Sequence, residues 1–182
     1  MKKRQTCKQT VPIVPSFTYR TGIGFDVHGF DKSTISEDNH VVLCGIQISH
    51  IYRLSAHSDG DVALHALTDA MLGAVAAGSI GLLFPPTDIQ WKGASSKIFV
   101  KHANSAISER KGIISNIDMI IICEIPKVMP HALEMRENVA NMLNLSLDQV
   151  HVKAVTTEKL GALGRKEGIA AQVVCTVMLP YT

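Results

Sequence analysis

Residues 117–123 form a nearly unbroken apolar run, IDMIIIC, in which four of the seven residues are isoleucine. Isoleucine is β-branched, and a short apolar run of this kind is typical of a strand that is covered on both faces of a sheet. Pro126 and Pro130 break the pattern a few residues later. We therefore predict a strand here that is buried on both faces.

The other elements follow from hydrophobic periodicity and from the positions of glycine and proline. Strands are predicted at residues 19–27, 41–48, 150–155 and 169–179, and the first two are expected to pair. Helices are predicted at residues 62–77, 94–110 and 131–143. This order predicts an α+β fold with a mixed sheet of the four-stranded type and helices on one face. Because the other face also needs cover, we expect the chain to self-associate through it.

Length and composition predict one globular domain, since the chain has 182 residues of which 46% are hydrophobic. The net charge of +2 originates in the first 18 residues, which carry four basic and no acidic residues. The rest has 14 basic and 16 acidic residues, a net charge of −2. The domain therefore gives no electrostatic case for nucleic-acid binding. No run of 18 apolar residues occurs, so no membrane span is predicted.

Residues 1–18 predict a disordered basic tail before a single domain at residues 19–182, with a targeting sequence as the alternative for the tail. The cysteines show no C-x-x-C spacing, which argues against a zinc ribbon and a redox motif. We expect buried free thiols in a reducing compartment. The four cysteines are Cys7, Cys44, Cys123 and Cys175.

Residues 56–65, AHSDGDVALH, place two histidines and two aspartates around a predicted helix start. Asp59 or Asp61 can cap the helix, and His65 lies one turn inside it. Asp61, His65 and Asp69 share one helical face, so a carboxylate can orient the second ring nitrogen of His65. A core histidine with ordinary capping carboxylates is the simpler interpretation, and this segment alone leaves it open.

Asp26 and His28 alternate on the first predicted strand, and a period of two puts both side chains on one face. With His65 they form a set of two imidazoles and one carboxylate. Such a set leaves a coordination position open and is typical of catalytic zinc. The same set suits iron or manganese, and Asp-x-His pairs also arise by chance.

A second polar cluster, TTEK at residues 156–159, follows the strand predicted at residues 150–155. The hydroxyls of Thr156 and Thr157 can donate to phosphate oxygens, and Glu158 can hold a hard cation such as Mg²⁺. A strand end with solvated side chains is the simpler alternative, which composition alone favours. Lys127, directly after Pro126, can likewise bind an anion through its ammonium group or be only a turn residue.

Five segments carry a family resemblance: GFDVH at residues 24–28, AHSDGDV at 56–62, LHALTDA at 64–70, KA at 153–154 and TTEKLG at 156–161. Together they resemble the family of 2-C-methyl-D-erythritol 2,4-cyclodiphosphate synthases of the non-mevalonate isoprenoid pathway. The resemblance spans residues 20 to 180 in the correct order. Several motifs of this length in register make it highly specific.

The resemblance implies a lyase that converts 4-diphosphocytidyl-2-C-methyl-D-erythritol 2-phosphate into 2-C-methyl-D-erythritol 2,4-cyclodiphosphate and CMP. The 2-phosphate attacks the β-phosphate within one molecule. It also implies a homotrimer whose sheets pack around the threefold axis, with active sites at the subunit interfaces. The compartment implied is the cytoplasm of a bacterium or a plastid-type organelle, with no nucleic-acid or membrane partner.

The same resemblance implies two metals, Zn²⁺ (one per subunit) and Mg²⁺ or Mn²⁺. Asp26, His28 and His65 match the zinc ligands, and Glu158 matches the protein ligand of magnesium. His57 and Thr156 match catalytic positions that hold the substrate phosphates and stabilise the transition state.

Substrate-binding positions are implied in two groups. One group is Asp26, Val27, His28, His57, Ser58, Ser79, Ile80, Gly81, Phe84, Pro85, Thr87 and Asp88. The cytosine and phosphate pocket is implied at Cys123, Pro126, Lys127, Val128, Met129, Val155, Thr156, Thr157 and Glu158. Arg165 and Glu167 match residues near the threefold axis, where some relatives accept isoprenoid diphosphates.

The chain departs from the family pattern at four positions. Ser79 stands where an acidic residue usually binds the ribose hydroxyls, and Pro86 replaces an acidic residue near the methylerythritol pocket. Val155 replaces the first of three threonines, and Ala162 replaces an aromatic residue of the axial cavity. The metal ligands are intact, so catalysis is expected to survive. A zinc-dependent phosphohydrolase and a non-catalytic trimeric binding protein are the two alternative functions.

Overall fold

The structure is a computed structural model that describes residues 16–181. Its strands are β1 (Phe17–Asp31), β2 (His40–Leu43), β3 (Ile46–Ser49), β4 (Arg53–Leu54), β5 (Ile113–Ile122), β6 (Val150–Val155) and β7 (Gly168–Pro180). Its α-helices are α1 (Val62–Ala74), α2 (Ile80–Leu83), α3 (Lys97–Glu109), α4 (Ala132–Leu143) and α5 (Gly161–Gly164). Short 3-10 helices are η1 (Ile89–Trp91), η2 (Met129–His131) and η3 (Leu147–Gln149).

The main sheet has the strand order β4-β1-β7-β5-β6, and β2 and β3 form a separate two-stranded sheet. β5 and β6 run parallel, whereas the other neighbours in the main sheet run antiparallel. Because β4 contributes only two residues, the sheet is four-stranded over most of its length. The predicted α+β fold with a mixed, four-stranded-type sheet is confirmed.

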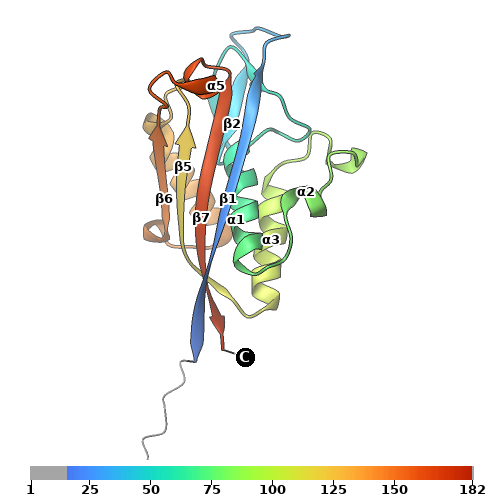
Figure 1. The fold of residues 1–182 in the computed structure, drawn as a ribbon, viewed down its shortest axis with the longest axis vertical. Coiled ribbons are helices and arrows are strands. Elements are labelled where there is room, and N and C mark those ends of the chain that lie inside the picture. The colour runs from blue at the N-terminus through green and yellow to red at the C-terminus, as the bar shows by residue number, and fades with distance from the viewer. Residues whose placement is uncertain (1–15, 182) are drawn as a thin grey trace, which may run out of the picture.

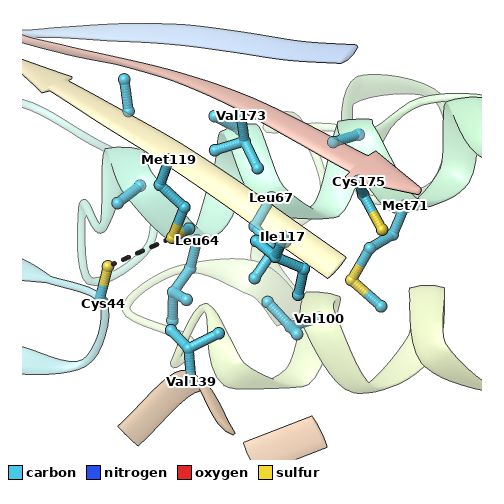
Figure 2. Packing of buried hydrophobic residues seen from close by; sticks show 14 of the residues in the cluster. Cys44, Leu64, Leu67, Met71, Val100, Ile117, Met119, Val139, Val173 and Cys175 are labelled. Atoms are coloured by element: carbon cyan, nitrogen blue, oxygen red, sulfur yellow. Dashed lines mark hydrogen bonds between the residues drawn. The ribbon is translucent and has the colours of Figure 1, made fainter. Parts of the chain in front are cut away.

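Helices α1, α3 and α4 lie on one side of the main sheet (Figure 1). Figure 2 shows the core that results, in which side chains of these helices converge on the inner faces of β5 and β7. The labelled side chains include Leu64, Leu67 and Met71 of α1, Val100 of α3, Val139 of α4, Ile117 and Met119 of β5, and Val173 and Cys175 of β7, all buried. The prediction of helices on one face is confirmed.

Strand β1 packs against helix α1 at backbone contact. A Cβ atom added at Gly24 would lie 1.9 Å from the carbonyl oxygen of Ala66, and one added at Gly22 would lie 2.0 Å from that of Ala70. Real Cβ atoms never approach a carbonyl oxygen so closely, so both positions require glycine. This close approach brings Asp26 and His28, further along β1, next to His65 on α1.

Strand β5 is buried on one face only, so the prediction of burial on both faces is wrong for the single chain. Its residues alternate, with Met119 and Ile121 fully buried and Ile120 and Ile122 half-buried. The helices cover one face, and the opposite face of the sheet stays open.

Residues 41–48 form a hairpin rather than the single strand predicted. The chain turns at Cys44 (φ 52°) and Gly45 (φ 77°), and positive φ at both central residues is the geometry of a tight two-residue hairpin. β2 therefore pairs with β3, and the predicted pairing with the first strand is also wrong, because β1 pairs with β7 and β4.

Other differences lie at element ends. α1 stops at Ala74, three residues early, because Ala76 takes a left-handed conformation (φ 53°). α3 starts at Lys97, three residues late, and the segment 80–83, for which no helix was predicted, forms the short helix α2. β1 begins at Phe17, so the last two residues of the predicted tail belong to the strand, while residues 1–15 lie outside the described residues.

Among residues 16–181, no helix is long and apolar enough to cross a membrane. Cys44, Cys123 and Cys175 are free and buried, as predicted, whereas Cys7 lies outside the described residues. Burial raises the pKa of the Cys123 thiol to about 11 and that of Cys175 to about 12. These two thiols therefore stay protonated at neutral pH, which disfavours a role as nucleophiles.

Candidate metal centre and active site

Three predicted ligand atoms meet where β1 faces the first turn of α1. His65 Nδ1 lies 3.0 Å from Asp26 Oδ2 and 3.0 Å from His28 Nε2, and the last two atoms are 3.2 Å apart. The structure thus brings Asp26, His28 and His65 together as one potential metal-binding group.

Helix α1 is fixed in place by its N-cap, Asp61. The buried Asp61 carboxylate accepts hydrogen bonds from the backbone N–H of Leu64 (3.0 Å), which is the capping bond, and from those of Cys44 (3.0 Å) and Gly45 (2.6 Å) in the β2–β3 turn. Burial raises the pKa of Asp61 to about 6, even though these N–H groups favour its ionised form. The cap therefore ties the hairpin to the helix that carries His65.

Serine hydroxyls, and not a carboxylate of its own helix, hold the second ring nitrogen of His65. His65 Nε2 lies 3.0 Å from Ser58 Oγ and 2.9 Å from Ser96 Oγ. Ser96 is buried and donates from its hydroxyl and its backbone N–H to Asp59. The prediction that an i,i+4 aspartate orients His65 is therefore wrong.

The two helical aspartates are occupied elsewhere. Asp61 caps α1, and Asp69 Oδ1 accepts a hydrogen bond from the backbone N–H of Ile80 (2.6 Å), which fixes the start of α2. Sequence spacing identified the residues near His65 on its own helix. It could not identify Ser96, which lies 31 residues further along the chain.

The donor set fits a small divalent cation. Ligand atoms around a tetrahedral zinc ion with 2.0–2.1 Å bonds lie about 3.3 Å apart, close to the 3.0–3.2 Å separations seen here. The set offers one carboxylate oxygen and two imidazole nitrogens, and the second ring nitrogen of His65 is hydrogen-bonded, as it usually is in a metal-bound imidazole, here to two serine hydroxyls.

Asp26 is ionised in this setting. Burial alone would favour the neutral acid, but the hydrogen bonds from His28 and His65 outweigh it and hold the pKa of Asp26 below its usual range. An anionic oxygen beside two imidazoles is the charge state that a metal site requires.

The three donor atoms open into a cavity of about 220 Å³. Its lining brings together eight residues implied by the family resemblance: Asp26, His28, His57, Ser58, His65, Ile80, Gly81 and Phe84. Trp91, Phe99 and Pro86 complete the wall. The rings of Phe84, Trp91 and Phe99 contact one another with centroids 4.6 to 5.8 Å apart. We call this cavity the metal pocket.

Trp91 and Phe99 were not among the predicted site residues. Aromatic residues in a glycine- and proline-rich loop and at the start of a helix give no periodic signal of a shared pocket. The one available clue was that Trp91, the only tryptophan of the chain, lies close to the glycine- and proline-rich segment 78–88, which is unusually apolar for a loop.

A second cavity, of about 290 Å³, lies at the ends of β5 and β6. It brings together seven predicted residues: Cys123, Pro126, Lys127, Val128, Met129, Val155 and Thr156. Glu124, Pro130 and Ala154 also line it. We call this cavity the nucleotide pocket, after the role that the resemblance implies.

Eight predicted residues line neither pocket: Val27, Ser79, Pro85, Thr87, Asp88, Thr157, Glu158 and Arg165. Val27 is 52% exposed on the open face of the sheet, because side chains alternate along β1. Ser79 precedes α2, and Asp88 caps η1 through the backbone N–H of Gln90 (3.1 Å). Arg165 Nε donates to Glu167 Oε1 at 2.7 Å on the surface.

The fold and this centre define a class of protein, an α+β domain with an open metal site of two histidines and one carboxylate. Comparison with known proteins makes the assignment specific. A model of the YgbB family matches residues 19–178. The 2-C-methyl-D-erythritol 2,4-cyclodiphosphate synthase of Ehrlichia canis is 55% identical over 158 residues, which cover 86% of this chain and 91% of the relative.

Solved structures agree. The bifunctional IspDF of Campylobacter jejuni matches with a TM-score of 0.83 and 42% identity, over 91% of this chain and 43% of that one. The CDP complex of IspF from Plasmodium falciparum matches with a TM-score of 0.76 and 30% identity, over 90% of this chain and 97% of that one. The chain therefore belongs to the YgbB family, and the resemblance found in its motifs is confirmed.

Proposed function

We propose that the chain converts 4-diphosphocytidyl-2-C-methyl-D-erythritol 2-phosphate into 2-C-methyl-D-erythritol 2,4-cyclodiphosphate and CMP. The observation that carries this proposal is the triad of donor atoms, 3.0–3.2 Å apart, at the base of an open pocket. Membership of the YgbB family and the synthase names of its relatives support it. The chain is then an enzyme of isoprenoid precursor biosynthesis.

Asp26, His28 and His65 would hold Zn²⁺, and Glu158 would hold Mg²⁺ or Mn²⁺. Bound divalent cations supply positive charge that offsets the repulsion between the 2-phosphate and the diphosphate. The donor set, with one anionic oxygen and two imidazoles, supports zinc among the metals that such a set can bind.

The chain's own groups orient the substrate. His57 and Ser58 line the metal pocket beside the triad, where they can donate to phosphate oxygens. The aromatic wall of Phe84, Trp91 and Phe99 offers an apolar surface on which the methyl group and C–H bonds of the methylerythritol part of the substrate can pack. Because the nucleophile is the substrate's own phosphate, positioning supplies much of the rate, and no side-chain nucleophile is needed.

The nucleotide pocket would receive the CMP part of the substrate. Lys127 provides its positive charge, and Thr156 provides a hydroxyl for a phosphate oxygen. Val155, which stands where the family has a threonine, contributes an apolar side chain to the same wall, so one side-chain donor is missing there.

The two pockets would join between copies of the chain. They share no lining residue, and they lie at opposite edges of the four main strands, since Asp26 and His28 are on β1 whereas Val155 ends β6. Three strand spacings, about 14 Å, separate β1 from β6. A homotrimer whose sheets face one another would bring the metal pocket of one copy next to the nucleotide pocket of another.

The open face of the sheet supports this assembly. Four large apolar side chains of β1 project from it: Tyr19 (66% exposed), Ile23 (62%), Phe25 (57%) and Val27 (52%). An exposed apolar stripe of this length is typical of a subunit interface. Arg165 and Glu167 would lie near the threefold axis, where an isoprenoid diphosphate is the proposed ligand.

Phosphorus NMR tests the function. We expect the protein, supplied with the cytidyl substrate and Mg²⁺, to release CMP and a cyclic diphosphate, and a chelator to stop the reaction. Release of inorganic phosphate would instead identify a hydrolase that uses water as the nucleophile. Binding without turnover by the metal-loaded protein would identify a binding protein.

A further inference from the structure

The loop after β6 holds a backbone conformation that its sequence disfavours. Glu158 (φ 52°) and Lys159 (φ 66°) are consecutive non-glycine residues in the left-handed region. Side chains with a Cβ atom rarely adopt this conformation, and it persists only where the surroundings hold it. The loop carries Thr156 and Glu158, which the proposed function assigns to the phosphates and to Mg²⁺.

One carboxylate from another strand holds this loop. Glu124 Oε1 accepts hydrogen bonds from the backbone N–H of Thr157 (3.2 Å) and from that of Lys159 (3.1 Å), the residues on either side of Glu158. Glu124 lies two residues after Ile122, the last residue of β5. The contact therefore joins the end of β5 to the loop that follows β6. Both bonds converge on a single oxygen atom.

The contact also links the two segments that line the nucleotide pocket. Glu124 and Lys127 come from the segment after β5, and Thr156 comes from the loop after β6. Within the loop, Thr156 Oγ1 donates to Glu158 Oε1 at 3.0 Å, so the position of one functional side chain sets that of the other. A shift of the loop backbone would therefore move both groups.

A negative charge on Glu124 does not suit the binding of a polyanionic substrate. A carboxylate beside a diphosphate site repels the ligand unless the protein uses its charge. Here the charged carboxylate accepts hydrogen bonds from two backbone N–H groups, and such bonds are stronger to an ionised acceptor than to a neutral one.

We propose that Glu124 is a positioning residue, which holds the Thr156–Lys159 loop in the conformation that presents Thr156 and Glu158 to the nucleotide diphosphate and its Mg²⁺. This inference rests on the proposed function and adds a residue to it. Glu124 acts through the backbone of Thr157 and Lys159, and it does not itself touch the metal.

Two substitutions separate positioning from charge. Glu124→Ala removes the acceptor oxygen, whereas Glu124→Gln keeps an oxygen that can accept both N–H bonds. Glu137→Ala, an exposed glutamate on α4, is the matched control for loss of one carboxylate. All are compared with the parent protein by thermal unfolding, by zinc content and by calorimetric titration with CDP in the presence of Mg²⁺.

We expect Glu124→Ala to weaken CDP binding in Mg²⁺ about tenfold and to raise the KM of the cytidyl substrate more than it lowers kcat. Zinc content should not change, because the triad lies in the other pocket. Glu137→Ala should bind CDP as the parent does, and Glu124→Gln should lose less affinity than Glu124→Ala, because its amide oxygen still accepts both N–H bonds, although more weakly than a carboxylate. Unchanged CDP binding in Glu124→Ala, or an equal loss in Glu124→Gln, would overturn the inference.

Hydrogen exchange at the amides of Thr157 and Lys159 keeps this test separate from that of the proposed function. Exchange should quicken in Glu124→Ala alone, whether or not the protein makes a cyclic product. If the parent protein neither binds CDP nor turns over the substrate, the proposed function fails. Unchanged exchange in Glu124→Ala would independently overturn the inference that Glu124 holds the loop.

Discussion

In the metal pocket the functional atoms are fixed by buried neighbours, whereas beside the nucleotide pocket they sit on an exposed loop. His65 is 8% exposed, its outer nitrogen is held by two hydroxyls, and its helix is capped by a fully buried Asp61. Glu158 is exposed, in a left-handed conformation held by Glu124. The metal pocket is thus held by buried residues of the core, whereas the loop beside the nucleotide pocket depends on a few surface hydrogen bonds.

This difference predicts which substitutions the protein should tolerate. The metal pocket is complete within one chain, since β1 and α1 supply all three donor atoms. The nucleotide pocket lacks these ligands and, in our proposal, meets a metal pocket only in a neighbouring copy. Changes to the core should therefore damage the metal pocket, whereas changes to exposed side chains that contact neither the proposed metals nor the loop at residues 156–159 should have small effects.

The largest effect is expected from His65→Ala, which removes one of the three proposed zinc ligands. Zinc should be lost and activity should fall by more than the factor of about 10–100 that outer-shell substitutions cause. Metal analysis of the purified variant, together with the phosphorus NMR assay, measures both. A variant that kept both zinc and activity would exclude His65 as a ligand.

Gly24→Ala tests whether the close packing of β1 on α1 builds the triad. Because the added Cβ atom would lie 1.9 Å from the carbonyl oxygen of Ala66, the backbones must separate, and we expect a loss of at least about 3 kcal/mol in the free energy of unfolding. Denaturant unfolding measures it. Gly29→Ala, on the same strand with only an ordinary contact at 3.7 Å, is the control and should change little.

Ser96→Ala should weaken metal binding without abolishing it. The substitution removes one hydroxyl that fixes His65 and the link from His65 to Asp59. Loss of such a partner typically lowers metal affinity about 10–100-fold, which competition with a chromogenic chelator can measure. The control is Ser95→Ala, at the exposed neighbouring position. Equal zinc affinity in both variants would show that the hydroxyl has no part in the site.

The smallest effect is expected at the Arg165–Glu167 ion pair on the surface. Arg165 lowers the pKa of Glu167, so the pair stabilises the fold above the usual pKa of a glutamate, and the contribution is lost as the pH falls below it. Because both groups are exposed, solvent screens the pair, and Glu167→Gln should leave the thermal midpoint at neutral pH unchanged. A clear drop at neutral pH would mean that these residues are buried in an assembly.

Most of the core was predictable from the sequence, because it follows local patterns. The apolar periodicity of residues 150–155 and 169–179 gave β6 and β7 to within one residue at each end. The alternation of Asp26 and His28 gave two ligands on one strand face. The prediction for residues 41–48 was wrong because apolar residues lie on both sides of the turn at Cys44 and Gly45. Asp61, from a later segment, stabilises this turn.

The parts of the site that sequence could not supply are contacts between distant segments. Ser96 reaches His65 across 31 residues, and Glu124 reaches Thr157 across 33. Neither contact has a periodic signal, since a hydroxyl at a helix start and a glutamate after a strand are common in any role. The three residues of the candidate metal site could be predicted because their residue types and spacing are restrictive, whereas the residues that position them could not.

The most direct test of the account is a mixture of two inactive variants. His65→Ala lacks one donor of the metal pocket and Glu158→Ala lacks the proposed magnesium ligand, so each should be inactive alone. If the two pockets join between copies, unfolding and reassembling the variants together in equal amounts should restore about one quarter of the parent activity, because that share of interfaces pairs two intact pockets. No recovery from a mixture shown to contain mixed oligomers would mean that each active site is built within one chain, which would contradict the account.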